Sequence, residues 1–278
     1  MAARRIKYDC VFSLGEVCFC ANYLRSMRLR KFSSPFDWVA GATFAERMNF
    51  LLNDFQNFFN KEDFVYHGKR EYPEPCNIYY NRRTHIIFNH DFPLFKSFEE
   101  TYPKVKKRYD HRIKHLYQKI YKSKRVLIVY METFSTKSGI ETEKEICKMM
   151  KETKYKFPMQ RVDLIYIRHN ENMADDEFDV RELDNNVTMI SCYNRSRDDN
   201  KDNLAIGNYH NVRQLFKNIR CKDNLFNSLA YRIYYLARNI RKMIYRHKIK
   251  NGEEYIRILG IKVYRHQLEE NKERENAG

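Results

Sequence analysis

A cysteine at the start of a predicted helix is the sharpest candidate for chemistry in this chain. Residues 8–13 predict a buried strand, Gly15 a tight turn, and residues 17–27 a helix, so Cys18 falls in the first helical turn. The positive end of a helix dipole favours the thiolate, and backbone N–H groups near Gly15 are suited to holding an oxyanion. The alternative is that Cys18 is a small buried hydrophobic residue.

A thiol nucleophile needs a general base, usually a histidine that a third polar group holds in place. His90 follows the strand predicted at residues 85–88 and is flanked by Asn89 and Asp91. Neighbours along a strand point to opposite faces, so Asp91 can orient His90 only if both lie in a loop after the strand. His169, at the end of another predicted strand, is the second candidate base. A partly buried structural histidine is the alternative for His90.

The elements that must position these residues alternate along the chain. Apolar strands are expected at residues 8–13, 85–88, 126–131, 162–167 and 187–192, and amphipathic helices at 17–27, 43–59, 95–121 and 141–153. This alternation predicts an α/β fold with three layers, a mostly parallel sheet covered by helices on both faces. Because ligands bind at the carboxyl ends of parallel strands, the residues around Ser13, His90 and Glu132 are expected to converge.

The last part of the chain differs in composition, and a boundary is predicted after residue 223. From Leu229 onward apolar residues recur at helical spacing among many arginines, and a strand-like hook ending at Tyr264 follows. The predicted organisation is an α/β domain at residues 1–223 with the Cys/His site, and a basic amphipathic helical appendage with its hook at residues 224–278. We expect the segment from Leu229 to Tyr264 to dock on an anionic membrane surface, the alternative being a helix packed on the domain.

Charge and composition limit the class of protein. The 278 residues carry a formal net charge of +16, and the basic residues cluster at 104–125 and 231–266. Neither segment contains a nucleic-acid recognition motif, so no nucleic-acid partner is expected. The chain shows no secretory signal and no apolar run near the roughly 20 residues that span a bilayer. Seven cysteines without even spacing fit a reducing compartment. We expect a cytoplasmic protein, peripheral on the inner membrane through its tail.

No metal or cofactor is expected. Cys18 and Cys20 form a CxC pair, but no second Cys/His pair stands at zinc-site spacing. Cys20 points about 200° away from Cys18 around the helix, so we expect Cys20 in the core.

Several motifs, taken in order, resemble a known family. Ser13-Leu14-Gly15-x-x-Cys18, Ser34-Pro35-Phe36-Asp37-Trp38 and Phe88-Asn89-His90-Asp91-Phe92 resemble a bacterial family of unknown function described as papain-like cysteine peptidases, over roughly residues 8–170. The resemblance implies Cys18 as nucleophile and His90 as its partner. This chain departs from the family's pattern near the end of the strand at residues 126–131, where an arginine is expected and Tyr130-Met131-Glu132 stands instead. The α/β order is closer to SGNH-type esterases than to papain, but the Asp-x-x-His of those esterases is missing.

Catalysis is assigned to Cys18, His90 and Asp91. Six further residues near the predicted site are assigned to substrate binding: Ser13, Gly15, Arg30, Asp37, Trp38 and Glu132. For Arg30 the alternative is a structural role at the negative end of the first helix. For Trp38, the one tryptophan of the chain, the alternative is a structural role in the core or as an anchor of the loop.

The predicted function is that of a cysteine-dependent hydrolase or acyltransferase, in which Cys18 attacks a carbonyl and His90 carries the proton. The tail, residues 258–264, resembles the C-terminal hooks of bacterial enzymes that assemble capsule and lipopolysaccharide, which suggests surface-polysaccharide intermediates as substrates. One alternative is a transferase of that assembly that uses an activated sugar or phosphate donor, with Cys18 structural. The other is a non-catalytic, membrane-associated binding module.

Overall fold

The computed structural model describes residues 6–71, 74–132, 141–174, 177–193, 213–214 and 216–222, and the backbone of 245–250, 253–258 and 261–267. The chain divides into two compact units, Met1–Lys69 with Cys76–Lys222, and Arg70–Pro75 with Asp223–Gly278. The helix predicted from Leu229 lies outside the described residues. In the second unit, β12 (Tyr245–Lys250), β13 (Glu253–Ile258) and β14 (Ile261–Gln267) form an antiparallel sheet, and the predicted hook falls in its last two strands. All predicted catalytic and substrate-binding residues lie in the first unit.

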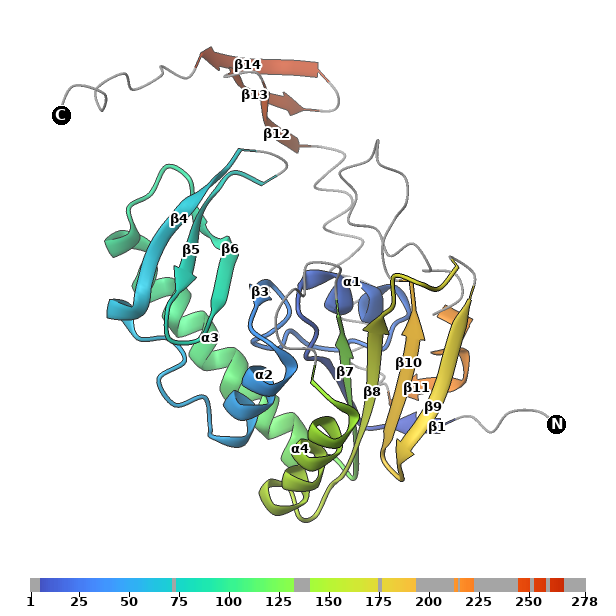
Figure 1. The fold of residues 1–278 in the computed structure, drawn as a ribbon. Coiled ribbons are helices and arrows are strands. Elements are labelled where there is room, and N and C mark those ends of the chain that lie inside the picture. Colours follow the sequence, from blue (N-terminus) through green and yellow to red (C-terminus); the bar gives the residue numbers. More distant parts are fainter. Residues whose placement is uncertain are drawn as a thin grey trace. The chain divides into compact units, whose positions relative to one another are not determined.

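A five-stranded sheet organises the first unit (Figure 1). Its order is β2 (Cys10–Ser13), β7 (Arg125–Met131), β8 (Arg161–His169), β10 (Val187–Cys192) and β9 (Phe178–Asp184). The first four strands run parallel, and β9 lies antiparallel at the edge. The prediction of an α/β fold is therefore confirmed.

Helices pack on both faces of this sheet because its central strands are apolar on both sides. In β7, Ile128 and Tyr130 belong to one hydrophobic cluster, which includes residues of α2 (Phe44–Leu52), α3 (Phe98–Tyr121) and α4 (Glu143–Lys156). Leu127 and Val129 belong to a second cluster with α1 (Cys18–Ser26). A short 3-10 turn, η2 (Phe216–Asn218), and a parallel strand pair, β1 (Ile6–Tyr8) with β11 (Ile219–Cys221), complete this second side.

Local sequence explains where the helices begin. Capping boxes open α2 and α4, with Thr43 and Glu46 in the first and Thr142 and Glu145 in the second. The predicted stripe of α3 is buried at Val105, Tyr109, Leu116 and Ile120, and Ile113 is partly buried against the same cluster. The prediction that a helix continues to residue 59 is wrong: α2 ends at Leu52, because residues 54, 55 and 57 adopt positive φ.

A second sheet corrects the predicted topology. β3 (Val39–Gly41), β6 (Ile86–Pro93), β5 (Cys76–Asn81) and β4 (Phe64–Arg70) form a four-stranded sheet whose β3–β6 and β5–β6 pairs are antiparallel. A short 3-10 turn, η1 (Lys61–Asp63), precedes β4. The predicted end of the strand at residue 88 is therefore wrong, because β5 and β6 pair as a hairpin and β6 continues through His90 and Asp91 to Pro93. The loop that would let Asp91 orient His90 is not formed.

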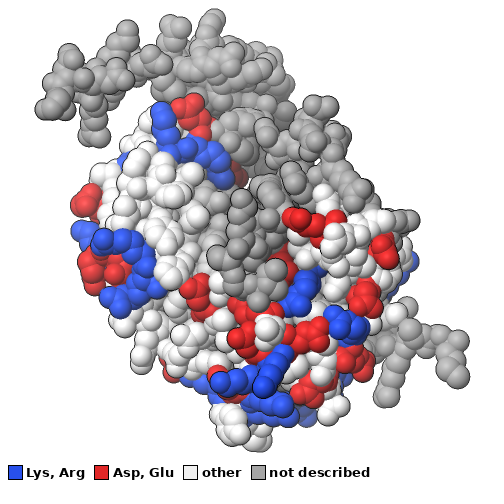
Figure 2. All heavy atoms as spheres, in the orientation of Figure 1, with Lys and Arg blue, Asp and Glu red and all other residues white. Residues whose placement is uncertain are grey.

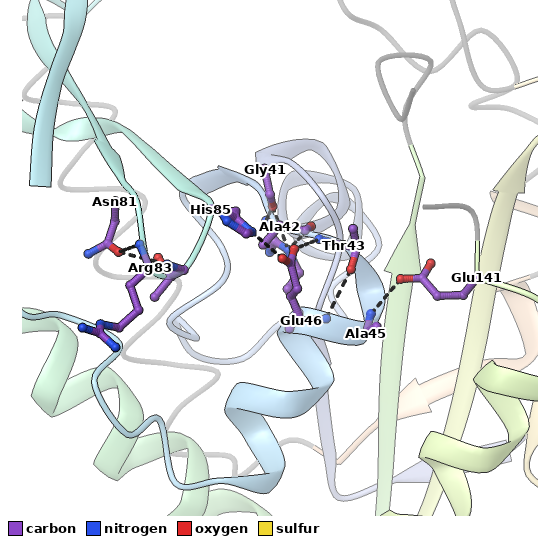
Figure 3. Close-up of polar contacts among 11 residues, drawn as sticks. Gly41, Ala42, Thr43, Ala45, Glu46, Asn81, Arg83, His85 and Glu141 are labelled. Carbon is purple, nitrogen blue, oxygen red and sulfur yellow. Dashed lines mark hydrogen bonds and ion pairs between the residues drawn. The ribbon is translucent and has the colours of Figure 1, made fainter. Parts of the chain in front are cut away.

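The tip of the β5–β6 hairpin docks on the turn between β3 and α2 (Figure 3). The backbone N–H of Ala42 donates to the carbonyl of His85 at 3.0 Å, and Nδ1 of His85 lies 2.5 Å from Oε1 of Glu46. Gly41 allows this approach, since its φ is +73° and an added Cβ would lie 2.5 Å from the His85 carbonyl oxygen. Glu46, the glutamate of the α2 capping box, thus also fixes the sheet that carries His90.

The surface carries mixed charge. On the face in Figure 2, Lys and Arg are interspersed with Asp and Glu among the described residues. No helix in the described ranges is both long enough and apolar enough to cross a membrane.

Gly41→Ala is expected to destabilise the protein by about 2–4 kcal/mol, because it adds a backbone clash to an unfavourable φ. Gly68→Ala is the matched control, since Gly68 also has positive φ, +144°, but a Cβ added there would meet no described atom within 4 Å. We expect the control to cost about 1 kcal/mol from strain alone. Urea unfolding of both variants measures the difference. Equal losses would show that the hairpin contact contributes nothing.

Candidate functional site

The turn that leads into Cys18 is held against the central sheet. Oγ of Ser13 accepts from the backbone N–H of Gly15 at 3.1 Å, and the backbone N–H of Glu16 donates to the Met131 carbonyl at 3.2 Å. A Cβ on Gly15 would lie 2.3 Å from Cβ of Cys20, so only glycine lets α1 pack this closely on the turn. Ser13 and Gly15 therefore shape the backbone in front of the thiol.

Cys18 is the first residue of α1 and is half-buried. The helix has no side-chain cap at Val17 and no acidic residue in its first turn. The partial positive charge of the helix N-terminus is thus not offset by a carboxylate within that turn.

Cys20 has a structural environment, as the sequence predicts. Its side chain is fully buried, and Sγ donates to the Val129 carbonyl at 3.4 Å. Burial raises the pKa of this thiol to about 12. The two cysteines of the CxC pair therefore differ, and only Cys18 has partial solvent exposure.

The Ser34–Trp38 loop is built around a buried ion pair. The Asp37 carboxylate accepts from Nε of Arg30 at 2.6 Å and from both the backbone N–H and Oγ of Ser34, at 3.0 and 2.7 Å. Oγ of Ser34 also lies 3.4 Å from the Ser13 carbonyl oxygen, at the end of β2. Burial raises the pKa of Asp37, and the Arg30 guanidinium opposes that rise. Arg30 and Asp37 thus hold this loop beside the turn that precedes Cys18.

Trp38 connects α1 with β6. The guanidinium carbons of Arg30 and Arg25 lie 5.2 and 5.9 Å from the indole centroid, within cation–π range. The His90 ring meets the same indole edge-to-face, with centroids 5.9 Å apart. Arg25 and Cys18 are seven residues apart, so they project from the same face of the helix. Through Trp38, the helix face that carries Cys18 is linked to His90.

Asp91 faces away from His90, because the two residues are neighbours in a strand. Its carboxylate is buried, accepts from the Tyr109 hydroxyl at 2.7 Å and pairs with Arg108 at 3.0 Å. Burial raises the pKa of Tyr109 well above its usual value, and Asp91 adds to the rise. These contacts fasten β6 to α3, so they set the position of His90 through the backbone.

Glu132 directly follows β7 and belongs to a second buried network. Its Oε1 accepts from the Tyr166 hydroxyl at 2.5 Å, and its Oε2 accepts from the backbone N–H of His169 at 3.0 Å. Burial raises the pKa of Glu132. Glu141 lies within 3.4 Å of the same hydroxyl. The ends of β2 and β7 converge as predicted and the end of β8 lies beside them, whereas His90 lies on the other sheet, in contact with Trp38.

Arg47 was not among the residues that the sequence predicted to belong to the site. It is fully buried, and its Nη2 donates to the carbonyls of Gly41 at 2.6 Å and Glu16 at 2.8 Å, while Nε donates to the Ala42 carbonyl at 3.2 Å. Desolvation lowers the pKa of this guanidinium to about 10. The signal was present in the sequence, because position 47 falls on the apolar face of its helix, beside Phe44 and Met48.

The described residues contain no cluster of three or more His, Cys, Asp or Glu side chains able to hold a metal ion.

Asp37→Ala is expected to cost about 3–5 kcal/mol of stability, because it leaves the Arg30 charge buried and unpaired. The double variant Arg30→Met/Asp37→Ala removes both charges and should be more stable than Asp37→Ala alone. Urea unfolding of Asp37→Ala, Arg30→Met and the double variant, each compared with the unmodified protein, forms a double-mutant cycle. If the two single losses simply add in the double variant, the pair is not coupled.

No curated protein and no solved structure matches the chain. A protein family whose description is "putative papain-like cysteine peptidase" matches residues 9–172, more than half of the chain. The matched range contains the turn before Cys18, the Ser34–Trp38 loop, His90 and Glu132. The chain belongs to this family.

Proposed function

We propose that this protein is a cysteine-dependent hydrolase or acyltransferase with Cys18 as its nucleophile and His90 as its general base. The observation that carries the proposal is the position of Cys18. It is half-buried and opens a helix with no side-chain cap, directly after a turn that requires glycine. The family description supports the same chemistry. The contact between Trp38 and His90 supports His90 over His169, whose ring lies against Tyr193 at a centroid distance of 5.3 Å.

In the proposed reaction, His90 takes the thiol proton and the Cys18 thiolate attacks the carbonyl carbon of the substrate. Backbone N–H groups of the Gly15 turn and the first turn of α1 hold the resulting oxyanion. His90 then returns the proton to the leaving group as its bond to the carbonyl carbon breaks. Water, or a second acceptor, attacks the thioester with His90 again as base, which releases the acyl group and restores Cys18.

The other predicted site residues act in this proposal by positioning. Arg30 and Asp37 fix the loop that carries Trp38 beside the end of β2. Asp91 fixes β6 on α3 through Tyr109. Glu132 joins the ends of β7 and β8 next to the Glu16 backbone.

For the biological setting, we propose surface-polysaccharide metabolism at a membrane. The similarity of residues 258–264 to the hooks of capsule and lipopolysaccharide enzymes supports intermediates of a surface polysaccharide as substrates. The basic tail supports docking on an anionic membrane surface from the cytoplasmic side. Deleting residues 229–278 should then abolish sedimentation with anionic liposomes, and unchanged sedimentation would remove this part of the proposal.

Alkylation by iodoacetamide at pH 6, followed by peptide mass spectrometry, tests the reactive thiol. An ordinary thiol is only about 0.3% ionised at that pH, so a Cys18 with a depressed pKa should react at least about tenfold faster than such a thiol. Cys147 is the internal reference, since it is half-buried and burial raises its pKa. Equal labelling of Cys18 and Cys147 would contradict a depressed pKa of Cys18.

His90→Gln is expected to slow Cys18 alkylation at pH 6 about tenfold or more, because the thiolate loses its imidazolium partner. The matched control is His111→Gln, on the exposed side of α3. An unchanged Cys18 rate in the His90 variant, with native unfolding behaviour, would remove His90 from the proposed mechanism.

A further inference from the structure

Arg25 is a cation on the Cys18 face of α1 that the proposed reaction does not use. Its side chain is half-buried, and its guanidinium lies over the Trp38 ring, at 5.9 Å from the centroid. No carboxylate among the described residues lies within ion-pair distance of its guanidinium. Arg30, on the same indole, is instead neutralised by Asp37 at 2.6 Å. The net positive charge at the Trp38 ring therefore belongs to Arg25.

The negative end of the helix dipole explains in part why Arg25 stands in the last turn of α1. Arg28, just beyond the end of α1, can serve that purpose equally well and is exposed. The dipole does not explain why Arg25 packs on Trp38, whose ring also contacts His90. Stacking on an aromatic ring holds a guanidinium in place and leaves its planar N–H groups available for a ligand.

The spacing along α1 limits what such a ligand can be. Seven residues are just under two helical turns, so Arg25 lies about 10 Å along the axis from Cys18 and within about 20° of the same direction. A guanidinium pairs best with the two oxygens of a carboxylate or a phosphate. Cys18 and Arg25 thus mark two points on one helix face, one for a carbonyl carbon and one for an anion.

We propose that the acyl substrate of this site carries a carboxylate or phosphate group about 10 Å from the reacting carbonyl, which Arg25 binds. This inference rests on the proposed function and adds the class of substrate. The neutral pair Arg30–Asp37 anchors the indole, and Arg25 supplies the charge that selects the substrate.

Matched alkylating probes test the inference. Each probe is an iodoacetamide with a linker of about 10 Å that ends in a carboxylate, a phosphate or a neutral primary amide. The second-order rate of Cys18 alkylation at pH 6 is measured for each. We expect the anionic probes to react about tenfold faster than the neutral probe, because a charge-assisted pair with Arg25 raises their occupancy. The ratio of carboxylate to phosphate rates distinguishes the two anions.

Arg25→Gln should bring the ratio of anionic to neutral rates close to one. Arg28→Gln is the matched control, because it removes the same charge beside the same helix but off the Cys18 face, and it should leave the ratio unchanged. Arg25→Lys keeps the charge without the planar fork and should retain part of the preference. Equal loss in the Arg25 and Arg28 variants would attribute the preference to net charge and overturn the inference.

The outcomes separate this inference from the proposed function. If the neutral probe labels Cys18 no faster than Cys147, the proposed function fails. If the neutral probe labels Cys18 selectively and the anionic probes show no advantage, the function stands and the anionic substrate is wrong. Urea unfolding of the Arg25 variants confirms that changed rates do not reflect a loss of fold.

Discussion

The arrangement of the site depends on the hydrogen bonds that the buried Arg47 guanidinium donates. It donates to the Glu16 carbonyl, in the turn before Cys18, and to the carbonyls of Gly41 and Ala42, between β3 and α2. The backbone N–H of Ala42 in turn donates to the His85 carbonyl at the tip of the hairpin. One side chain therefore connects the turn before the proposed nucleophile to the sheet that carries the proposed base. Carbonyl oxygens rather than a carboxylate hold this charge, so its removal would leave several buried acceptors without donors.

Three buried carboxylates add rigidity around this connection. Asp37 closes the loop that presents Trp38, Asp91 fastens β6 to α3, and Glu132 joins the ends of β7 and β8. Asp91 and Glu132 accept hydrogen bonds from other elements, and Asp37 accepts them from Arg30 and from Ser34 of its own loop, which offsets part of the cost of burying each carboxylate. A proposed catalytic pair drawn from two sheets requires this support, because small displacements between sheets would separate the thiol from the imidazole.

Much of the central fold could be predicted from local pattern. The strands β7, β8 and β10 coincide closely with the apolar runs, and α3 buries the predicted stripe from Val105 to Ile120. The predicted convergence of the ends of β2 and β7 also holds. These features depend on short-range periodicity and on the rule that parallel strands share one carboxyl edge. The second sheet could not be predicted in this way, since an apolar run such as residues 86–88 has the same pattern in a parallel or an antiparallel sheet.

Local sequence pattern is sufficient to place Cys18 in the first turn of a helix after a glycine turn and Cys20 in the core, because both predictions follow from helical geometry within a few residues. Three contacts depend instead on tertiary packing: Asp91 with Tyr109, Arg47 with two separate segments, and Trp38 with both Arg25 and His90. Those contacts join residues from separate elements. Their formation depends on which faces of the elements pack together, and hydrophobic periodicity does not specify the partner of a polar side chain.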